Sequence, residues 1–250
     1  MRLTRRHALS LAGAALALPR GLAARQSATA VRIATEGAFP PYNALDKKGN
    51  LVGFEIDLGH AICAAQGLEL IWVVTSWADM IPQLLDGDFD VIMAGMGITP
   101  ARAQRVAFSR EYFPGGDQPL GMYVGTHTFQ DPAKGLIAVQ ENTIHEEHLQ
   151  ALGARTLAFA TAGKALAAVL DGQANVTFGS PDFLEAQVYR TSRTLTILGT
   201  EPLAAGGAAA AFRKEDAALR QDFDAALEQL TEDGTLDRLN QKWFKTSRDI

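Results

Sequence analysis

Short apolar runs alternate with stretches of helical spacing along the first part of the chain. Residues 31–35, 68–74 and 89–94 have the apolar or alternating pattern of strands, whereas 55–66 and 77–85 have the apolar spacing of helices. A glycine or an Asp-Gly pair follows each predicted helix, which is a common stop signal. This order predicts a mostly parallel α/β sheet, and such sheets bind ligands beyond the carboxyl ends of their strands.

The stretch 90–102 brings several anion-binding elements to one such strand end. Gly95 and Gly97 break the apolar strand, and Thr99 precedes a proline in the pattern of a helix N-cap. Glycine amides and a helix N-terminus bind anions, and Arg102 has the planar fork that matches a carboxylate. Taken alone, this stretch fits a carboxylate site and an ordinary strand-to-helix turn with a solvated arginine equally well.

The N-terminal segment has the three-part layout of an export signal. Residues 1–30 contain five arginines and no acid, an apolar run at 8–18 and small residues at 28–30. The apolar run is about half of the ~20 residues that span a membrane. We therefore predict an exported, periplasmic protein whose signal peptide is cleaved near Ala30, and the arginines at 5–6 form an imperfect twin-arginine motif.

Charge and cysteine content limit which partners and covalent attachments the mature chain can have. Without residues 1–30 it has 18 basic and 28 acidic residues, a net charge of about −10, which argues against nucleic acid or an anionic membrane as partner. Cys63 is the only cysteine and lies in an apolar, periodic stretch, so we expect it to be buried. Neither an internal disulfide nor a lipid anchor is predicted.

Motifs spread over about eighty residues resemble those of one protein family. They are EGAFPPY at 36–42, GFEIDL at 53–58, GMGITPAR at 95–102, FS at 108–109 and Tyr112. In this order they resemble the signature of the periplasmic solute-binding proteins of polar amino-acid uptake systems, the family 3 extracellular solute-binding proteins. Residues 227–244 resemble the closing helices of that family, so the resemblance covers most of the mature chain.

The resemblance implies a two-lobed α/β fold of the periplasmic-binding-protein (Venus flytrap) class, type II, with two hinge strands. One lobe would comprise 31–117 and 206–250, and the other 118–205. The ligand would lie in the cleft between them. The two predicted crossings, at 115–125 and 203–212, contain several Gly, Ala or Pro residues.

The resemblance also assigns the ligand's carboxylate to two segments, one on each lobe. The first segment comprises Arg102, Gly95, Gly97 and Thr99, and the second comprises Asn142 and Thr143. The family usually has Gly-Thr at the second segment, where amides and a hydroxyl at a helix start contact the ligand. Thr143 keeps the hydroxyl, and Asn142 tolerates unusual backbone angles better than most residues.

The counter-charge for a ligand ammonium departs from the family pattern. Where the family commonly has an aspartate, this chain has Ser180, and a serine cannot offset a desolvated ammonium as a carboxylate does. Either Glu36, Glu141 or Asp182 takes over, or the ligand is not an ordinary α-amino acid, an alternative that the sequence slightly favours. Ser180 and Glu36 would set selectivity.

Aromatic residues are candidates for the remaining walls. Phe39, next to a proline pair in a loop, and Trp77 are expected to cover the ligand's side chain, and Tyr42 is a weaker candidate. No cofactor or metal is predicted. His145 and His148 lie three apart on a predicted helix, but without further ligands a solvated face explains them better.

Two functions on this scaffold remain open. The favoured one is the receptor of an ABC importer, which captures a small carboxylate-bearing solute, an amino acid or similar, and presents it to a membrane permease. Because its lobes must move, we expect a monomer. The alternative is a periplasmic enzyme such as a cyclohexadienyl/arogenate-type dehydratase, in which Glu36 or Glu141 would be the general acid.

Overall fold

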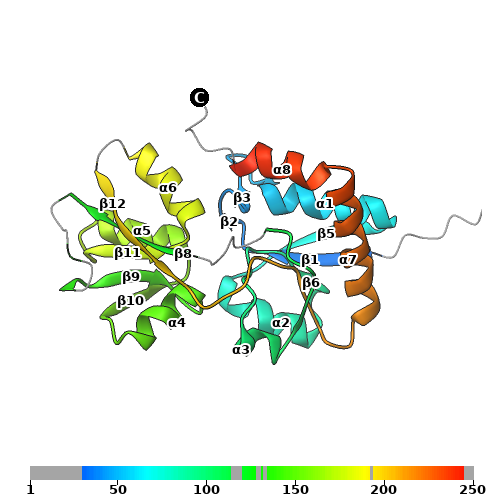
Figure 1. The fold of residues 1–250 in the computed structure, drawn as a ribbon, viewed down its shortest axis with the longest axis horizontal. Coiled ribbons are helices and arrows are strands. Elements are labelled where there is room, and N and C mark those ends of the chain that lie inside the picture. Colours follow the sequence, from blue (N-terminus) through cyan, green and yellow to red (C-terminus); the bar gives the residue numbers. More distant parts are fainter. Residues whose placement is uncertain (1–29, 114–119, 128–130, 132–133, 192–193, 245–250) are drawn as a thin grey trace, which may run out of the picture.

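The computed structural model describes residues 30–113, 120–127, 131, 134–191 and 194–244. Two five-stranded sheets with their helices form two bodies that lie side by side (Figure 1). The first lobe carries the sheet of order β5-β1-β6-β13-β7, and the second lobe carries the sheet of order β10-β9-β11-β8-β12. Residues 1–29 of the predicted signal peptide (1–30) and residues 115–119 of the first predicted crossing lie outside the described residues.

The sheet of the first lobe has a parallel core, as the alternating pattern predicts. Its strands are β1 (Ala30–Thr35), β5 (Glu69–Val74), β6 (Val91–Ile92), β7 (Ala107–Phe108) and β13 (Ala211–Phe212). β1 pairs in parallel with β5 and β6, and β13 pairs antiparallel to β6 and β7. Ile33 and Ala34 pack into separate hydrophobic clusters, because neighbouring residues of a strand face opposite sides of the sheet.

Helices cover both faces of this sheet (Figure 1). They are α1 (Phe54–Gln66), α2 (Met80–Asp86), α3 (Pro100–Ala103), α7 (Ala217–Glu232) and α8 (Thr235–Phe244), with a 3-10 turn η1 (Trp77–Asp79) before α2. α1, α7 and α8 pack together over one face, and α2 lies on the other. Cys63 of α1 is buried, as expected.

Two predicted elements differ in detail. The predicted helix at 77–85 begins with the 3-10 turn η1, and the predicted strand at 89–94 is regular only at Val91–Ile92. Backbone hydrogen bonds to β1 nevertheless extend beyond these two residues, since Asp90 N donates to Arg32 O (2.9 Å) and Met93 N to Ala34 O (2.9 Å).

A small three-stranded sheet projects from the first lobe next to the other lobe. It consists of β2 (Ala38–Phe39), β3 (Asn43–Leu45) and β4 (Leu51–Val52), which pair antiparallel. Phe39 packs against the first lobe's core and also against one of the two core clusters of the second lobe. The loop that carries the predicted aromatic wall therefore contacts both lobes.

The second lobe combines parallel and antiparallel pairs. Its strands are β8 (Leu120–Thr126), β9 (Ile137–Gln140), β10 (Thr156–Phe159), β11 (Val176–Gly179) and β12 (Leu195–Pro202), and its helices are α4 (Ile144–Ala151), α5 (Ala162–Leu170) and α6 (Pro181–Arg190). β9 is buried along its whole length, because helices cover both faces of the sheet. The proline at position 181 occupies the first turn of α6, where a proline is favoured.

The chain connects the lobes beside the cavity described below. Isolated bridges join Ala208 to Gly97 and to Phe113. The segment after β12 therefore pairs with two segments of the first lobe, one after β6 and one after β7. The lobe boundaries at 117/118 and 205/206 stay a prediction. Among the described helices, none is long and apolar enough to cross a membrane.

Candidate functional site

A cavity of about 390 Å³ lies between the two lobes. Loops and helix starts that follow the parallel strands β1, β6, β9 and β11 contribute to its walls, as expected for the carboxyl ends of such strands. The predicted site residues that line it are Glu36, Phe39, Trp77, Gly95, Gly97, Arg102, Thr143 and Ser180. Thr99 and Asn142 instead line a second hollow. Trp77 and Arg102 line both this hollow and the cavity, so their side chains lie between the two.

The guanidinium of Arg102 lies in the cavity wall and connects the lobes. Its Nη1 donates to Gly97 O (2.9 Å), and its Nη2 donates across the cleft to Asn142 O (3.3 Å). The guanidinium carbon lies 5.1 Å from the centre of the Trp77 ring, whose Nε1 also donates to Asn142 O (3.0 Å). Burial lowers the pKa of Arg102 to about 10, which still leaves it charged at neutral pH. The arrangement is not that of a solvated arginine.

The helix start before Arg102 has the predicted cap. Thr99 Oγ1 accepts a hydrogen bond from Arg102 N (3.2 Å), and a proline occupies the first turn of α3. Gly95 N points away from the cavity, since it donates to the buried Glu55 Oε1 (2.6 Å). With a φ of 64° and Phe39 Cε1 3.0 Å from where a Cβ would lie, Gly95 needs to be glycine for its backbone and for the close contact.

The hydroxyl of Thr143 caps α4. It accepts from Glu146 N (3.2 Å) and donates to Gln140 O (2.7 Å), so both of its usual roles are already occupied. Asn142 has a φ of 57°, in the region that asparagine tolerates, and its N donates to Glu146 Oε2 (2.6 Å). The first residues of α4 line the cavity, so its N-terminal amides and Arg102 together form a setting suited to an anion.

Glu36 is one of two acidic side chains in the cavity wall. It is 8% exposed and accepts a hydrogen bond from Gln140 Nε2 of the second lobe (2.8 Å). Burial raises the pKa of Glu36 to about 7, partly offset by that hydrogen bond. Glu36 therefore titrates near neutral pH. Glu141, which the sequence offered with Glu36 as a counter-charge or general acid, does not line the cavity.

Asp182 is the second acid of the wall and lies two residues after Ser180. Burial raises the pKa of Asp182, and hydrogen bonds from Tyr42 and Ser180 oppose this. The Tyr42 hydroxyl donates to Asp182 Oδ2 across the cleft (2.9 Å), whereas Ser180 Oγ lies 3.5 Å from the same oxygen. The start of α6 thus brings a carboxylate into the wall next to the serine at the family's aspartate position.

Aromatic rings line the cavity from both lobes. Phe39 stacks between Tyr42 (centroids 5.3 Å apart) and Phe183 of α6 (5.9 Å). Sequence reasoning gave Tyr42 little weight and missed Phe183 and Gln140. The proline after Ser180 is a helix-start signal that could have indicated α6, but no signal in the sequence places its first turn against Phe39.

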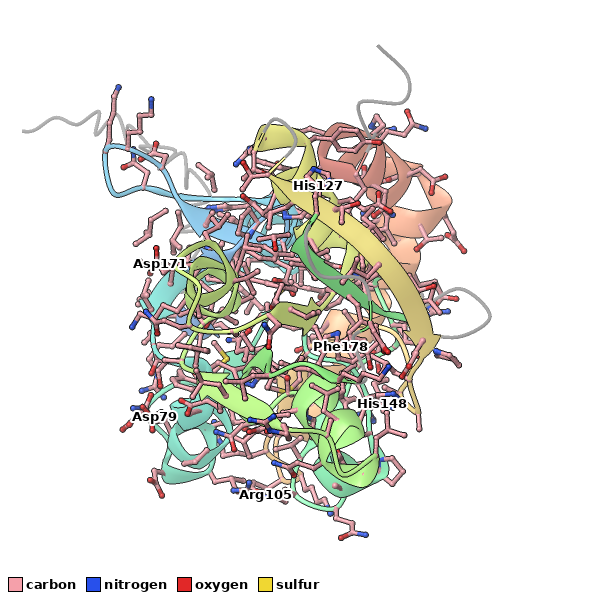
Figure 2. The ribbon with its side chains drawn as sticks, turned by 90° about the vertical axis from the view of Figure 1, so that its left-hand side faces the viewer. Asp79, Arg105, His127, His148, Asp171 and Phe178 are labelled. Atoms are coloured by element: carbon pink, nitrogen blue, oxygen red, sulfur yellow. The ribbon has the colours of Figure 1, made fainter. Side chains whose placement is uncertain are left out.

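The prediction of a solvated face for the two histidines of α4 is wrong. His148 Nε2 lies 2.7 Å from Glu201 Oε2, and its ring stacks on Phe178 with the ring centroids 5.7 Å apart. Both His148 and Phe178 are labelled in Figure 2. His145 lines the cavity, and burial lowers its pKa to about 3. Tertiary packing against β11 buries a helix face that looks polar in the sequence. In the described part of the chain, no group of three or more His, Cys, Asp or Glu could hold a metal ion.

Comparison with known proteins identifies the family. The model of the bacterial extracellular solute-binding proteins, family 3, matches residues 31–246. The chain belongs to this family. A periplasmic His/Glu/Gln/Arg/opine family-binding protein from Silicibacter pomeroyi, solved in complex with lysine, is similar in structure: TM-score 0.82, 38% identity, with 87% of this chain and 98% of that chain covered.

Two further relatives span most of this family 3 protein. The lysine/arginine/ornithine-binding periplasmic protein of Escherichia coli (strain K12) is 29% identical over 86% of this chain and 87% of its own. The structure of an ancestral amino acid-binding protein, described as a precursor of cyclohexadienyl dehydratase, has a TM-score of 0.74 and 30% identity, covering 86% of this chain and 95% of that one. The predicted family and the predicted type II, two-lobed fold are confirmed.

Proposed function

We propose that this protein is the periplasmic receptor of an ABC importer and captures an amino acid that carries a cationic group. The composition of the cavity wall carries the proposal. It contains one guanidinium, Arg102, and two carboxyl groups, Glu36 and Asp182, and no ion pair joins them within the described residues. A ligand with a carboxylate and one or two cationic groups has the complementary charges.

Each end of such a ligand has a candidate partner. Arg102 and the amides at the start of α4 would hold the carboxylate, and Gly97 would leave room for it. Asp182 would hold the α-ammonium in place of the family's usual aspartate. With this carboxylate present, the ligand can be an ordinary α-amino acid although Ser180 replaces that aspartate. Glu36 would hold a cationic side-chain group, and Phe39 and Trp77 would cover the aliphatic part. The basic amino acids named for the relatives support this choice.

Delivery of the ligand would involve a membrane permease and motion of the lobes. Contacts that cross the cleft, from Arg102, Trp77 and Gln140, belong to the closed arrangement. A ligand that touches both lobes would stabilise this arrangement, which the permease then recognises. The receptor would work as a monomer, after removal of the signal peptide near Ala30.

Calorimetric titration and thermal-shift measurements with arginine, lysine, ornithine, glutamine and octopine test the proposal. We expect a basic amino acid to raise the melting temperature and to bind at least tenfold more tightly than glutamine. Arg102→Ala should abolish this binding. Arg105→Ala is the matched control, because Arg105 lies on the same side of the cleft but lines only the outer hollow. Equal binding by Arg102→Ala and the parent protein would refute the assigned site.

One observation favours an enzyme as second candidate. Glu36 has a pKa of about 7 and so can give up a proton at neutral pH, as a general acid must. The likeness to the precursor of a dehydratase points the same way. Incubation with arogenate or prephenate, followed by product analysis, separates the two functions: a receptor returns its ligand unchanged, whereas a dehydratase releases water, carbon dioxide and an aromatic product. Turnover that Glu36→Gln abolishes would favour the enzyme.

A further inference from the structure

A buried glutamate lies behind the cavity wall of the first lobe. Glu55, in the first turn of α1, is fully buried and does not line the cavity. Its Oε1 accepts hydrogen bonds from Gly95 N (2.6 Å) and from the Tyr112 hydroxyl. Its Oε2 accepts one from Asn43 Nδ2 (2.8 Å). Three donors from three separate segments thus meet at one carboxylate, which lies at a helix N-terminus that favours negative charge.

The network reaches two of the first-lobe loops that face the cavity. One loop contains Gly95, whose φ is 64° and whose amide donates directly to Glu55. The other loop is reached through Asn43, whose Oδ1 accepts from Gly37 N (2.8 Å), and Gly37 has a φ of 68°. Gly37 directly follows Glu36, and the loop of Gly95 leads to Arg102. Glu55 therefore fixes the amide of Gly95 directly and that of Gly37 through Asn43.

We propose that Glu55 is a positioning residue, which fixes the loop of Glu36 and the loop of Gly95 relative to each other and thereby sets ligand affinity without touching the ligand. This inference rests on the proposed function. A carboxylate is required at position 55 because each of its two oxygens accepts hydrogen bonds: Oε1 from Gly95 N and the Tyr112 hydroxyl, and Oε2 from Asn43 Nδ2. An amide at position 55 has one acceptor and one donor, so it would face a donor either at Gly95 and Tyr112 or at Asn43.

A flip of the Asn43 amide does not relieve this conflict. Asn43 must present its oxygen to Gly37 N, so the nitrogen of Asn43 has to face position 55. Glu55→Gln therefore leaves one of the two loops with an unsatisfied contact. The double variant Asn43→Asp/Glu55→Gln restores every partner: the glutamine oxygen accepts from Gly95 and Tyr112, its nitrogen donates to the new aspartate, and the aspartate accepts from Gly37.

The test compares arginine binding by the parent protein, Glu55→Gln and the double variant. We expect Glu55→Gln to weaken binding at least tenfold and the double variant to bind within threefold of the parent protein. Ile62→Ala, a core substitution on the same helix, is the control for lost stability, and its affinity for arginine should stay within threefold. Parent-like affinity in Glu55→Gln, or an unrescued loss in the double variant, overturns the proposal.

Amide hydrogen exchange without ligand separates this inference from the proposed function. Exchange at 36–43 and 94–97 should quicken in Glu55→Gln and return to the parent rate in the double variant, whatever the ligand is. Ile62→Ala should not quicken these two segments more than the rest of the lobe. If Glu55→Gln fails to fold, the folding of the double variant becomes the rescue readout, and its failure to fold overturns the proposal.

Discussion

Replacement of Glu36 by glutamine should remove a pH dependence of stability. Glu36 has a pKa of about 7 in the folded protein, mainly through burial, against an ordinary value of 4.5. Between these two values the unfolded chain has lost the proton that the folded protein retains, so stability falls as pH rises. The gap of about 2.5 pH units, at about 1.36 kcal/mol each, corresponds to about 3 kcal/mol. Below pH 4.5 the contribution is fully present, and above pH 7 it is lost.

Glutamine mimics the neutral carboxyl group and can still accept the hydrogen bond from Gln140. Urea unfolding of the parent protein and of Glu36→Gln at pH 4.5, 6, 7 and 8 yields the difference in free energy of unfolding at each pH. Because the other titrating groups are common to both proteins, their effects cancel in this difference. We expect the two proteins to be nearly equal at pH 4.5 and Glu36→Gln to be more stable by about 3 kcal/mol at pH 8.

A flat difference between pH 4.5 and pH 8 would refute the argument, because it would mean that Glu36 is solvated in the folded protein. The same titration affects binding of a cationic ligand. A positive charge near Glu36 favours its ionised form, so affinity for arginine should rise as pH increases from 5 to 8, with release of a proton. Calorimetry in two buffers of different ionisation enthalpy measures that release.

Three further substitutions or reactions test the packing. Tyr42→Phe removes the donor to the half-buried Asp182 and should cost about 1–3 kcal/mol in urea unfolding at pH 7; no loss would show that Ser180 or solvent satisfies Asp182 instead. Gly121→Ala places a Cβ in steric overlap with the Phe178 ring and should cost about 1–3 kcal/mol in the same assay. Burial raises the pKa of the Cys63 thiol to about 11, so a thiol reagent at pH 8 should react only on unfolding, and rapid labelling of the folded protein would contradict this.

Local signals predicted much of the site on the first lobe. The strand, glycines, Thr99 and Arg102 follow one another within a single stretch, and the cap at Thr99 depends only on neighbours three residues away. The strand ends of a parallel sheet meet at one edge, so their loops could be grouped before any contact was known. This reasoning predicted Glu36, Trp77 and Arg102 as neighbours of one cavity.

Contacts across the cleft could not be read from local signals. Gln140 meets Glu36 and Asp182 meets Tyr42 over separations of more than a hundred residues, which no local spacing encodes. The protonation of Glu36 depends on burial between two lobes, and burial is a property of the assembled structure.

The sequence by itself determined the alternating fold and the arginine at the strand end, because strand and helix periodicity, glycine stops and helix caps act within a few residues. Its motifs also resemble those of the family, and that resemblance needs no tertiary contact. The tertiary structure alone decided which polar groups line the cavity between the lobes. Gly95 directs its amide to Glu55, Thr143 uses its hydroxyl as a cap, and Asp182 brings a carboxylate into the cavity wall beside Ser180. Each outcome depends on which partner packs nearby, and that is settled only when distant segments meet.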